Sequence, residues 1–361
     1  MSLGSPLAKA EHGSRGLNSE GPITLEVVAH ASGVSRATVS RVVNGDKRVN
    51  PSTRVTVESA IERLGYSPNR AARSLVTRRS DSIGLVIPEP TTRLFGDPFF
   101  PRLVRGISEM LAASSLQLVL FFPQSRSDEE RLRAYLVGGH VDGALLVSLH
   151  GDDPLPGYLV NADIPVVVGG RPPSGKSVSY VDMDNVDGAR MAVEHLASIG
   201  RRHIATVAGP RDMAVAADRL QGYREALANA GIDHDPELEV SADFDQDIAR
   251  QLVGELLVTH PEIDAIFAAS DLMALGVLQA LRAAGRTVPA DVAVVGFDDS
   301  TVALAADPPL SSVRQPIEEM GREMTRILLA SLAPAERVTR RLILSTELVV
   351  RASSGGDAAD D

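Results

Sequence analysis

Residues 24–45 read TLEVVAHASGVSRATVSRVVNG. Two short amphipathic helices fit this stretch, because apolar residues recur at helical spacing on both sides of the turn Ala31-Ser32-Gly33-Val34. Gly33 suits the turn, since glycine adopts a positive φ at little steric cost. Ser35 can cap the second helix, whose outward-facing side chains have the chemistry of a major-groove reader. The stretch predicts a helix-turn-helix, although a plain three-helix domain with a solvated arginine face would show a similar pattern.

The flanking residues extend this small helical domain. Thr24 can cap the first helix, and Asn50 followed by Pro51 suits the start of a third helix that Gly65 ends. The expected inward-facing residues are Leu25, Val28, Ala29, Val39, Val42, Val43, Val55, Ile61 and Leu64. We therefore expect a leader without fixed structure over 1–21, a helix-turn-helix domain over 22–68, and a linker over 69–80.

Charge is distributed unevenly along the 361 residues. The chain has a formal net charge of −11, yet residues 21–80 hold ten basic and four acidic side chains. A basic segment ahead of an acidic body is expected of a polyanion-binding module on a carrier. Cysteine is absent, which excludes disulfides and thiolate metal sites and is compatible with the cytoplasm. Neither a secretory signal nor an apolar run of membrane-spanning length is present, so we expect a cytoplasmic protein.

From Ser82 onward, apolar strands alternate with amphipathic helices over about 260 residues, which predicts parallel sheets with helices on both faces. One open sheet of ordinary size cannot hold so many elements, so two similar α/β lobes are expected. The expected strands are 83–87, 116–122, 143–147, 165–168, 203–208, 265–269 and 291–296. The expected helices are 99–113, 127–139, 185–199, 218–230, 246–258, 271–284 and 316–331. The small, acidic tail over 353–361 is expected to be disordered.

Five motifs follow one another between Thr24 and about Ala352: VAHASGVSRATVSRVVNG, SPNRAARSL, YVDMDNVDGARMAVEHLASIGRRHIA, PADVAVVGFDDS and LSSVRQP. Together they resemble the LacI/GalR family, the lactose and galactose repressor family. The resemblance implies a transcriptional regulator, in most cases a repressor, that binds a palindromic operator as a dimer. It also implies a periplasmic-binding-protein-like core with a sugar-like effector between its lobes, and leaves open whether the effector releases the protein from DNA or recruits it.

The resemblance assigns roles to residues of the headpiece and the linker. Arg36, Ala37 and Arg41 match base-contacting positions at the helix that starts near Ser35. The resemblance implies phosphate contacts for Thr24, Thr38, Asn44 and Tyr66. Ser35 and Ser40 of the second helix are further DNA-binding candidates, because their hydroxyls can bind phosphate. Residues 69–75 are expected to form a hinge helix only on operator DNA, with Ala72 and Arg73 in the minor groove. Leu75 would wedge a base step open there; the alternative for Leu75 is ordinary packing at the domain junction. The residues implied in DNA binding by the hinge are Asn69, Ala72, Arg73 and Leu75.

The resemblance implies that the chain of the core, residues 81–352, crosses between its lobes near Met183, Gln315 and residue 342. The first lobe would then hold about 81–183 and 316–341, and the second about 184–314 and 342–352. Ligands of open parallel sheets bind at the carboxyl ends of the strands. The resemblance and this rule give an expected effector site of Phe99, Phe100, Arg219, Phe244, Ser270 and Asp298, with His150 as a weaker candidate. Met213 and Val215 stand where purine-responsive relatives have arginine and threonine, which argues against a purine effector. Ala217 stands where some sugar-responsive relatives have an arginine, so the resemblance does not identify the effector.

An enzyme is the less favoured class. Residues 170–177, GRPPSGKS, satisfy a phosphate-loop pattern, but Pro172 and Pro173 lack the backbone N–H that such a loop needs. The residues after them alternate like a strand, whereas a phosphate loop opens a helix. No dinucleotide fingerprint, zinc-protease motif or serine-hydrolase motif occurs. We expect no cofactor, no metal and no catalytic residue. A sugar-binding carrier and a nucleotide-hydrolysing enzyme remain the alternatives.

Assembly follows from the expected DNA site. Two headpieces must meet two half-sites, so a two-fold dimer is the smallest working unit. Tetrameric relatives add a C-terminal helix with leucines at heptad spacing. This sequence has no leucine after Leu348, so a dimer that binds one operator is expected.

Overall fold

A computed structural model describes residues 23–43, 45–46, 48–66, 79–172, 177–333 and 338–355, and every structural statement below concerns these residues. Two compact units make up the chain, residues 1–78 and 79–361. Each has a hydrophobic core of its own.

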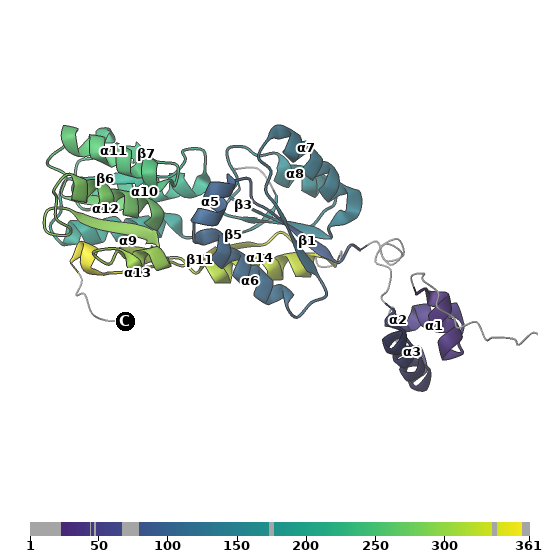
Figure 1. The fold of residues 1–361 in the computed structure, drawn as a ribbon. Helices are drawn as coiled ribbons and strands as arrows, with labels where there is room; N and C mark the ends of the chain where they lie inside the picture. The colour runs from purple at the N-terminus through teal and green to yellow at the C-terminus, as the bar shows by residue number, and fades with distance from the viewer. Residues whose placement is uncertain are drawn as a thin grey trace, which may run out of the picture. The chain divides into compact units, whose positions relative to one another are not determined.

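The first unit is a three-helix headpiece, drawn in purple in Figure 1. Its helices are α1 (Leu25–Ser32), α2 (Arg36–Val43) and α3 (Pro51–Leu64). Gly33 ends α1 with a φ of 67°, and its backbone N–H donates to the carbonyls of Ala29 and His30. The Ser35 hydroxyl accepts from the Thr38 backbone N–H and so caps α2. The predicted helix-turn-helix is confirmed in its local geometry, with Val28, Val39 and Val57 fully buried at its centre.

Two details of the headpiece differ from expectation. Thr24 stands at the N-cap of α1, but its side chain makes no capping hydrogen bond, whereas Asn50 caps α3 as predicted by accepting from Ser52. Val55 is 61% exposed, and Val57 and Ala60 face the core instead. Successive helical residues are about 100° apart, so Val55 lies about 200° around the helix from Val57 and cannot share its face.

The second unit holds two six-stranded sheets. The first sheet has the order β11-β5-β4-β3-β1-β2 with all strands parallel, and the second has the order β12-β10-β9-β8-β6-β7 with only β12 antiparallel. The strands of the first sheet are β1 (Ser82–Val86), β2 (Gln117–Phe121), β3 (Gly143–Val147), β4 (Val166–Gly169), β5 (Ser179–Met183) and β11 (Arg341–Leu344). Those of the second are β6 (Ile204–Ala208), β7 (Glu239–Ser241), β8 (Ala265–Ala268), β9 (Ala293–Asp298), β10 (Ser311–Arg314) and β12 (Glu347–Val349).

Helices cover both faces of both sheets, as the apolar strand runs predict. Those of the first lobe are α5 (Thr91–Gly96), α6 (Phe99–Leu111), α7 (Arg126–Tyr135) with a π-helical turn over Leu136–His140, α8 (Leu155–Asn161) and α14 (Ile317–Ser331). Those of the second lobe are α9 (Asn185–Ser198), α10 (Ala214–Asn229), α11 (Gln246–Thr259), α12 (Asp271–Ala283) and α13 (Thr301–Ala305), with 3₁₀ turns at Pro236–Leu238 and Ala352–Ser354. No helix in the described part of the chain is both long and apolar enough to cross a membrane.

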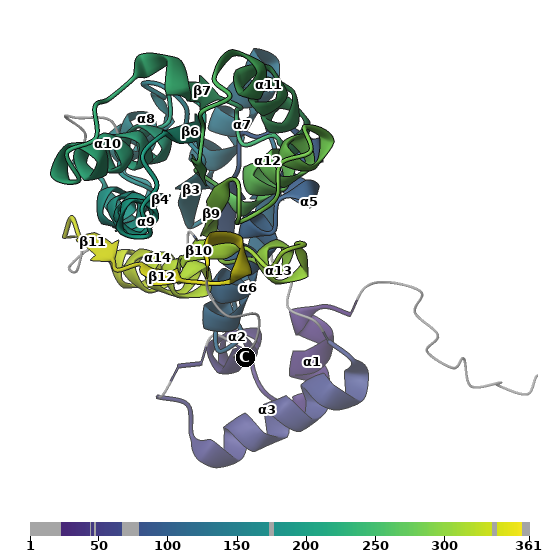
Figure 2. The same ribbon diagram turned by 90° about the vertical axis from the view of Figure 1, so that its left-hand side faces the viewer.

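The chain passes between the lobes three times. It leaves the first lobe after β5, returns before α14, and leaves again between β11 and β12. Figures 1 and 2 show α14, which is late in the chain, beside α6 of the first lobe. Because β11 pairs with β5 through Leu344, the third crossing follows Leu344, close to the expected residue 342.

The C-terminal segment is also a correction. Residues 353–361 were expected to lack structure; Ser353 and Ser354 are instead fully buried, and residues 356–361 lie outside the described part of the chain. The Ser353 hydroxyl donates to the Val294 carbonyl, and Ser354 bonds to the imidazole of His195. These buried hydrogen bonds hold Ser353 and Ser354 against β9 and α9, a contact that a composition rich in Ser and Gly does not reveal.

Candidate functional site

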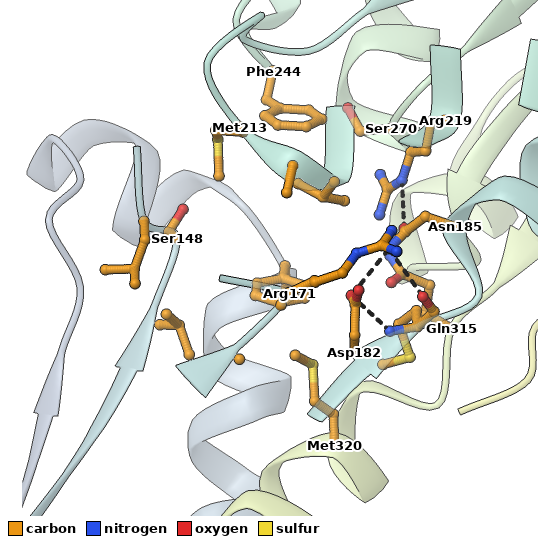
Figure 3. Close-up of a pocket in the computed structure, with 18 of the residues that line it drawn as sticks. Ser148, Arg171, Asp182, Asn185, Met213, Arg219, Phe244, Ser270, Gln315 and Met320 are labelled. Carbon is orange, nitrogen blue, oxygen red and sulfur yellow. Dashed lines mark hydrogen bonds between the residues drawn. The ribbon is translucent and has the colours of Figure 1, made fainter. Parts of the chain in front are cut away.

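One pocket of the second unit is lined by the loops at the carboxyl ends of both sheets (Figure 3). Its non-protein space is about 930 Å³, part of it open to solvent. The lining comes from segments after β1, β3 and β4 of the first lobe and after β6, β7, β8 and β9 of the second, together with crossing residues such as Asn185 and Gln315. All six residues of the predicted effector site, Phe99, Phe100, Arg219, Phe244, Ser270 and Asp298, line this pocket.

The backbone is strained where it enters the pocket. Ser148 after β3, Phe244 after β7 and Asp298 at the end of β9 have φ values of 59°, 58° and 116°. Non-glycine residues with positive φ cost free energy and concentrate at ligand-binding and active sites. The surrounding contacts therefore hold these three side chains in place at the expense of local strain.

Arg219 is the centre of the polar end of the pocket. It is buried; its Nε donates to Asn185 Oδ1 at 3.0 Å and its Nη1 donates to the Ala269 carbonyl at 2.5 Å. Its guanidinium lies 3.8 Å from the centroid of the Phe297 ring. Burial lowers the pKa of Arg219, although the carboxylates of Asp298, Asp182 and Asp97 oppose this shift. A guanidinium held this rigidly can present its remaining donors to a ligand in one orientation.

Two carboxyl groups face this guanidinium. Asp298 Oδ1 lies 3.9 Å from Arg219 Nη1 and accepts from the side-chain amide of Gln315. Burial raises the pKa of Asp298 well above its ordinary value, and Arg219 opposes that shift. Asp182, at the end of β5, accepts from Asn185 at 3.1 Å, and burial raises its pKa to about 6. The amide group of Asn185 thus links the buried arginine to Asp182, whereas the amide of Gln315 donates to Asp298 beside the guanidinium.

An aromatic side chain closes the other side of the pocket. The Phe244 ring sits against Gly209, where an added Cβ would lie 2.3 Å from the ring. The guanidinium of Arg93, from α5 of the opposite lobe, lies 4.7 Å from the Phe244 centroid. Phe100 is 1% exposed and belongs mainly to the first-lobe core, whereas Phe99 is half-buried. The Ser270 hydroxyl accepts from the Met273 backbone N–H and so caps α12 beside the pocket.

Several pocket residues were missed from the sequence. They are Arg93, Asp97, Ser148, Arg171, Asp182, Asn185, Asp212 and Gln315. Most of them follow or end a strand, and Asp182 and Asn185 stand within a quoted motif. The rule that ligands meet the carboxyl ends of parallel strands would have selected them, had it been applied to every strand.

His150, the weaker candidate, joins the two lobes at the rim of this pocket. Its Nδ1 lies 3.1 Å from Asp212 of the second lobe and its Nε2 lies 3.2 Å from the buried Glu89 of the first. The hydrogen bond with Glu89 raises the pKa of His150. Gly151 donates from its backbone to the Asp212 carbonyl at 2.9 Å, and Arg171 forms a second ion pair across the lobes with Asp218.

The headpiece places most of its predicted DNA-contacting residues on one helix. Arg36, Ala37 and Arg41 of α2 are exposed, and Thr38 and Ser40 of the same helix are half-buried. Arg36 forms a 2.9 Å ion pair with Glu26 of α1, both side chains being mostly exposed. Thr24 is exposed at the start of α1, whereas Tyr66 is buried in the headpiece core. The remaining predicted residues, Asn44, Asn69, Ala72, Arg73 and Leu75, lie outside the described part of the chain.

The phosphate-loop pattern lacks the context that it needs. Pro173, Ser174, Gly175 and Lys176 lie outside the described residues, and the chain then enters β5. A phosphate loop instead opens a helix whose N-terminus faces the phosphates.

Comparisons with known proteins agree with both units. Residues 24–69 match the family described as bacterial regulatory proteins, lacI family, and residues 193–354 match the periplasmic binding protein-like domain. The chain is 52% identical to the HTH-type transcriptional regulator CelR of Thermobifida fusca over 91% of this chain and 98% of that protein. It is 35% identical to a ribose operon repressor of Halalkalibacterium halodurans over 92% of this chain and 97% of that protein.

Solved structures give the same result. A transcriptional regulator CelR–cellobiose complex has a TM-score of 0.74 and 50% identity, covering 92% of this chain and 99% of that chain. A Lac repressor dimer bound to operator and the anti-inducer ONPF has a TM-score of 0.81 and 27% identity, covering 92% and 99%. With its helix-turn-helix headpiece and two-lobed binding core, this chain belongs to the LacI family of bacterial transcriptional regulators.

Proposed function

We propose that this protein represses transcription by binding a palindromic operator as a dimer, and that an uncharged sugar in the cleft controls that binding. The observation that carries the sugar assignment is the set of fixed donors and acceptors on Arg219, Asn185, Asp298 and Gln315 opposite the Phe244 ring. Hydroxyl groups need directed donors and acceptors, and the apolar face of a sugar ring packs on an aromatic ring. The cellobiose complex of a 50% identical relative supports cellobiose as the first ligand to test.

Control requires that the sugar bind the two conformations of the core with different affinities, since a ligand with equal affinity for both shifts neither population. The cleft is built from both lobes, so a ligand in it changes the free energy of lobe closure. The proposed route to DNA passes through the hinge over 69–75. As a regulator that acts on DNA, the protein would work in the cytoplasm, at the nucleoid.

The two alternative functions have less support. Sugar carriage does not account for the headpiece, whose helix α2 exposes Arg36 and Arg41. A nucleotide-hydrolysing enzyme would depend on residues 170–177 alone, and an assay for triphosphate turnover distinguishes it from a regulator.

The operator assignment is tested by selecting binding sites from random DNA duplexes and then replacing Arg36 by alanine. Selection should return a palindrome, and Arg36→Ala should relax the base preference at one position per half-site. A good bidentate contact is worth about 1–3 kcal/mol of discrimination, so the preference at that position should fall roughly 5- to 150-fold.

The control should be an exposed arginine elsewhere in the headpiece. Arg54 is unsuitable because its Nη2 donates to the Asp46 carbonyl and holds the loop between α2 and α3. Arg63, exposed in the last turn of α3, is suitable, and Arg63→Ala should leave the base preferences unchanged. Equal profiles for wild type and Arg36→Ala would show that α2 does not read bases through this residue.

The effector assignment is tested by titrating the full-length protein with cellobiose in a calorimeter and measuring operator affinity with and without the sugar. Asp298→Asn should weaken sugar binding by about 10-fold or more, because a charge-assisted hydrogen bond is worth about 1.5–3 kcal/mol. The variant should keep the operator affinity of the unliganded protein, since the headpiece is unchanged. Unaltered sugar affinity in Asp298→Asn would remove Asp298 from the site.

A further inference from the structure

Arg93 enters the cleft from α5, a short helix between β1 and α6 that the sequence analysis did not anticipate. Its side chain is 16% exposed, and one terminal nitrogen, Nη1, donates to Glu89 at 2.6 Å. Its guanidinium reaches across the cleft to the Phe244 ring of the second lobe, at 4.7 Å, and lies 5.9 Å from Phe100 of its own lobe. Arg93 is therefore a first-lobe residue placed against the aromatic side of the pocket.

One donor of this side chain has no partner. Arg93 Nε is buried, and its N–H has no hydrogen-bond acceptor among the residues that the structure describes. A buried N–H without an acceptor is unfavourable, because it has lost its hydrogen bond to water without replacement. The Arg93 side chain lines the pocket, but its Nε is closed to solvent in this structure. A ligand oxygen in the pocket is an acceptor that can satisfy this N–H when the side chain turns on binding.

The charges around Arg93 decide which kind of oxygen fits. Glu89 already pairs with the guanidinium and also accepts from Ser148 and bonds to His150. Asp97 is buried between α5 and α6 and lines the same pocket. It interacts electrostatically with both Arg93 and Arg219. Two carboxyl groups next to one guanidinium disfavour a phosphate or a carboxylate. A hydroxyl group suits this position, because it accepts from an N–H and can donate to a carboxylate.

We propose that Arg93 is a specificity-determining residue of the effector cleft, whose Nε–H donates to a hydroxyl oxygen of an uncharged sugar packed beside Phe244. The cleft thereby selects neutral sugars over sugar phosphates and sugar acids. This inference rests on the proposed function, namely that the cleft binds a sugar.

Lysine is the informative replacement. Arg93→Lys keeps the positive charge beside Glu89 and the cation above the Phe244 ring, but it lacks the second, separately directed donor of the planar guanidinium. A loss of sugar affinity in this variant therefore reports the missing N–H and not a missing charge. Arg105→Lys is the matched control, because Arg105 is an ion-paired arginine of the same lobe that does not line the pocket.

The experiment uses full-length protein and calorimetric titration with cellobiose, its four- to six-position monodeoxy analogues, and cellobiose 6-phosphate. Wild type and Arg105→Lys should bind cellobiose equally, and at least about 10-fold more tightly than the phosphate. Arg93→Lys should bind cellobiose about 10-fold or more weakly, with operator affinity unchanged. One deoxy analogue should bind wild type more weakly than cellobiose does, yet bind Arg93→Lys as well as cellobiose does, because the hydroxyl that it lacks is the partner of Arg93.

The outcomes separate this inference from the proposed function. If wild type binds neither cellobiose nor its phosphate, sugar control of this protein is wrong and the inference falls with it. If wild type binds cellobiose and Arg93→Lys binds it within threefold, the cleft is a sugar site but the role of Arg93 is wrong. Tighter binding of the phosphate than of cellobiose overturns the selection of neutral sugars. If Arg93→Lys fails to bind operator, Arg93→Gln replaces it in the cellobiose titration. The affinities of Arg93→Gln for cellobiose, and of wild type for the deoxy analogues, then decide whether Arg93 binds a sugar hydroxyl.

Discussion

At the scale of single residues, Asp182 shows how a binding site reduces the stability of its own protein. Asp182 is buried, and desolvation raises its pKa from 3.8 to about 6. The folded state therefore binds this proton up to a higher pH than the unfolded state does. Linkage then requires that stability fall as pH rises from about 4 to about 6, and that the loss persist at neutral pH. Asp182→Asn removes the titration while its side-chain oxygen can still accept from Met183 and Asn185.

We predict that Asp182→Asn stabilises the protein at pH 7.5 by about 1–3 kcal/mol and weakens sugar binding. Urea unfolding of both proteins at several pH values between 4.5 and 7.5 measures the effect. The difference in free energy of unfolding between the variant and wild type should shrink as pH falls toward 4.5. The comparison at pH 4.5 therefore serves as the control for the comparison at pH 7.5. An advantage that is constant across this range would mean that burial of the charge is not its cause.

At the scale of elements, two glycines let α6 and α14 approach closely. A Cβ on Gly106 would lie 2.0 Å from the Glu318 carbonyl oxygen, and one on Gly321 would lie 2.5 Å from the Leu103 carbonyl oxygen. Backbone atoms cannot move aside as a flexible side chain can, so an added methyl group must separate the helices. Figure 2 shows the two helices together at the side of the first sheet.

Gly106→Ala should therefore destabilise the protein by about 3 kcal/mol or more, as expected for overpacking against a rigid neighbour. Gly254→Ala on α11 is the matched control, because nothing lies within 4 Å of its Cβ position. The control should be neutral or stabilising by up to about 1 kcal/mol, since alanine favours a helix interior. Chemical unfolding of both variants tests this, and equal stability changes in the two would refute the close approach of α6 and α14.

At the scale of the whole core, His150 ties one lobe to the other. Its pKa is raised by the hydrogen bond with Glu89, with Asp212 adding to the shift. A raised histidine pKa means that the stabilising contribution is complete below about pH 6.5 and is lost as pH rises through the higher folded-state value. His150 and Asp212 are partly exposed, with side-chain exposures of 36% and 53%, so solvent screening keeps the effect modest.

We predict that His150→Asn lowers the melting temperature at pH 6 and that its difference from wild type diminishes toward pH 9. Asp212→Asn should show the same trend, since it removes the second-lobe charge but keeps the backbone bond between Gly151 and residue 212. Thermal unfolding across this pH range is the measurement. A difference that does not change with pH would exclude protonated His150 as the link between the lobes.

Features that depend on neighbouring residues were predictable from the sequence. The turn at Gly33, the caps at Ser35 and Asn50, and the alternation of strands and helices from Ser82 follow from local backbone preferences and from the spacing of apolar residues. The six predicted effector residues meet in one pocket because each follows or ends a strand, or lies on the helix after it. Parallel strands bring those ends to the same edge of a sheet. The strand pattern and the family resemblance together therefore selected residues that lie in one pocket, although their segments are distant in the chain.

Features that depend on how distant segments approach one another were decided only by the tertiary structure. The short strands β7, β10, β11 and β12 carry too few residues to show a period, and β11 joins the first sheet because β5 offers it an open edge. The inward face of α3 was misjudged at Val55, since the direction of the core depends on where α1 and α2 pack. Arg93 and His150 contact residues of the other lobe, and burial raises the pKa of Asp182. Local sequence sets the conformation of each segment. The free energy of a buried contact depends instead on the segment packed against it, because that segment excludes water and brings its own charges.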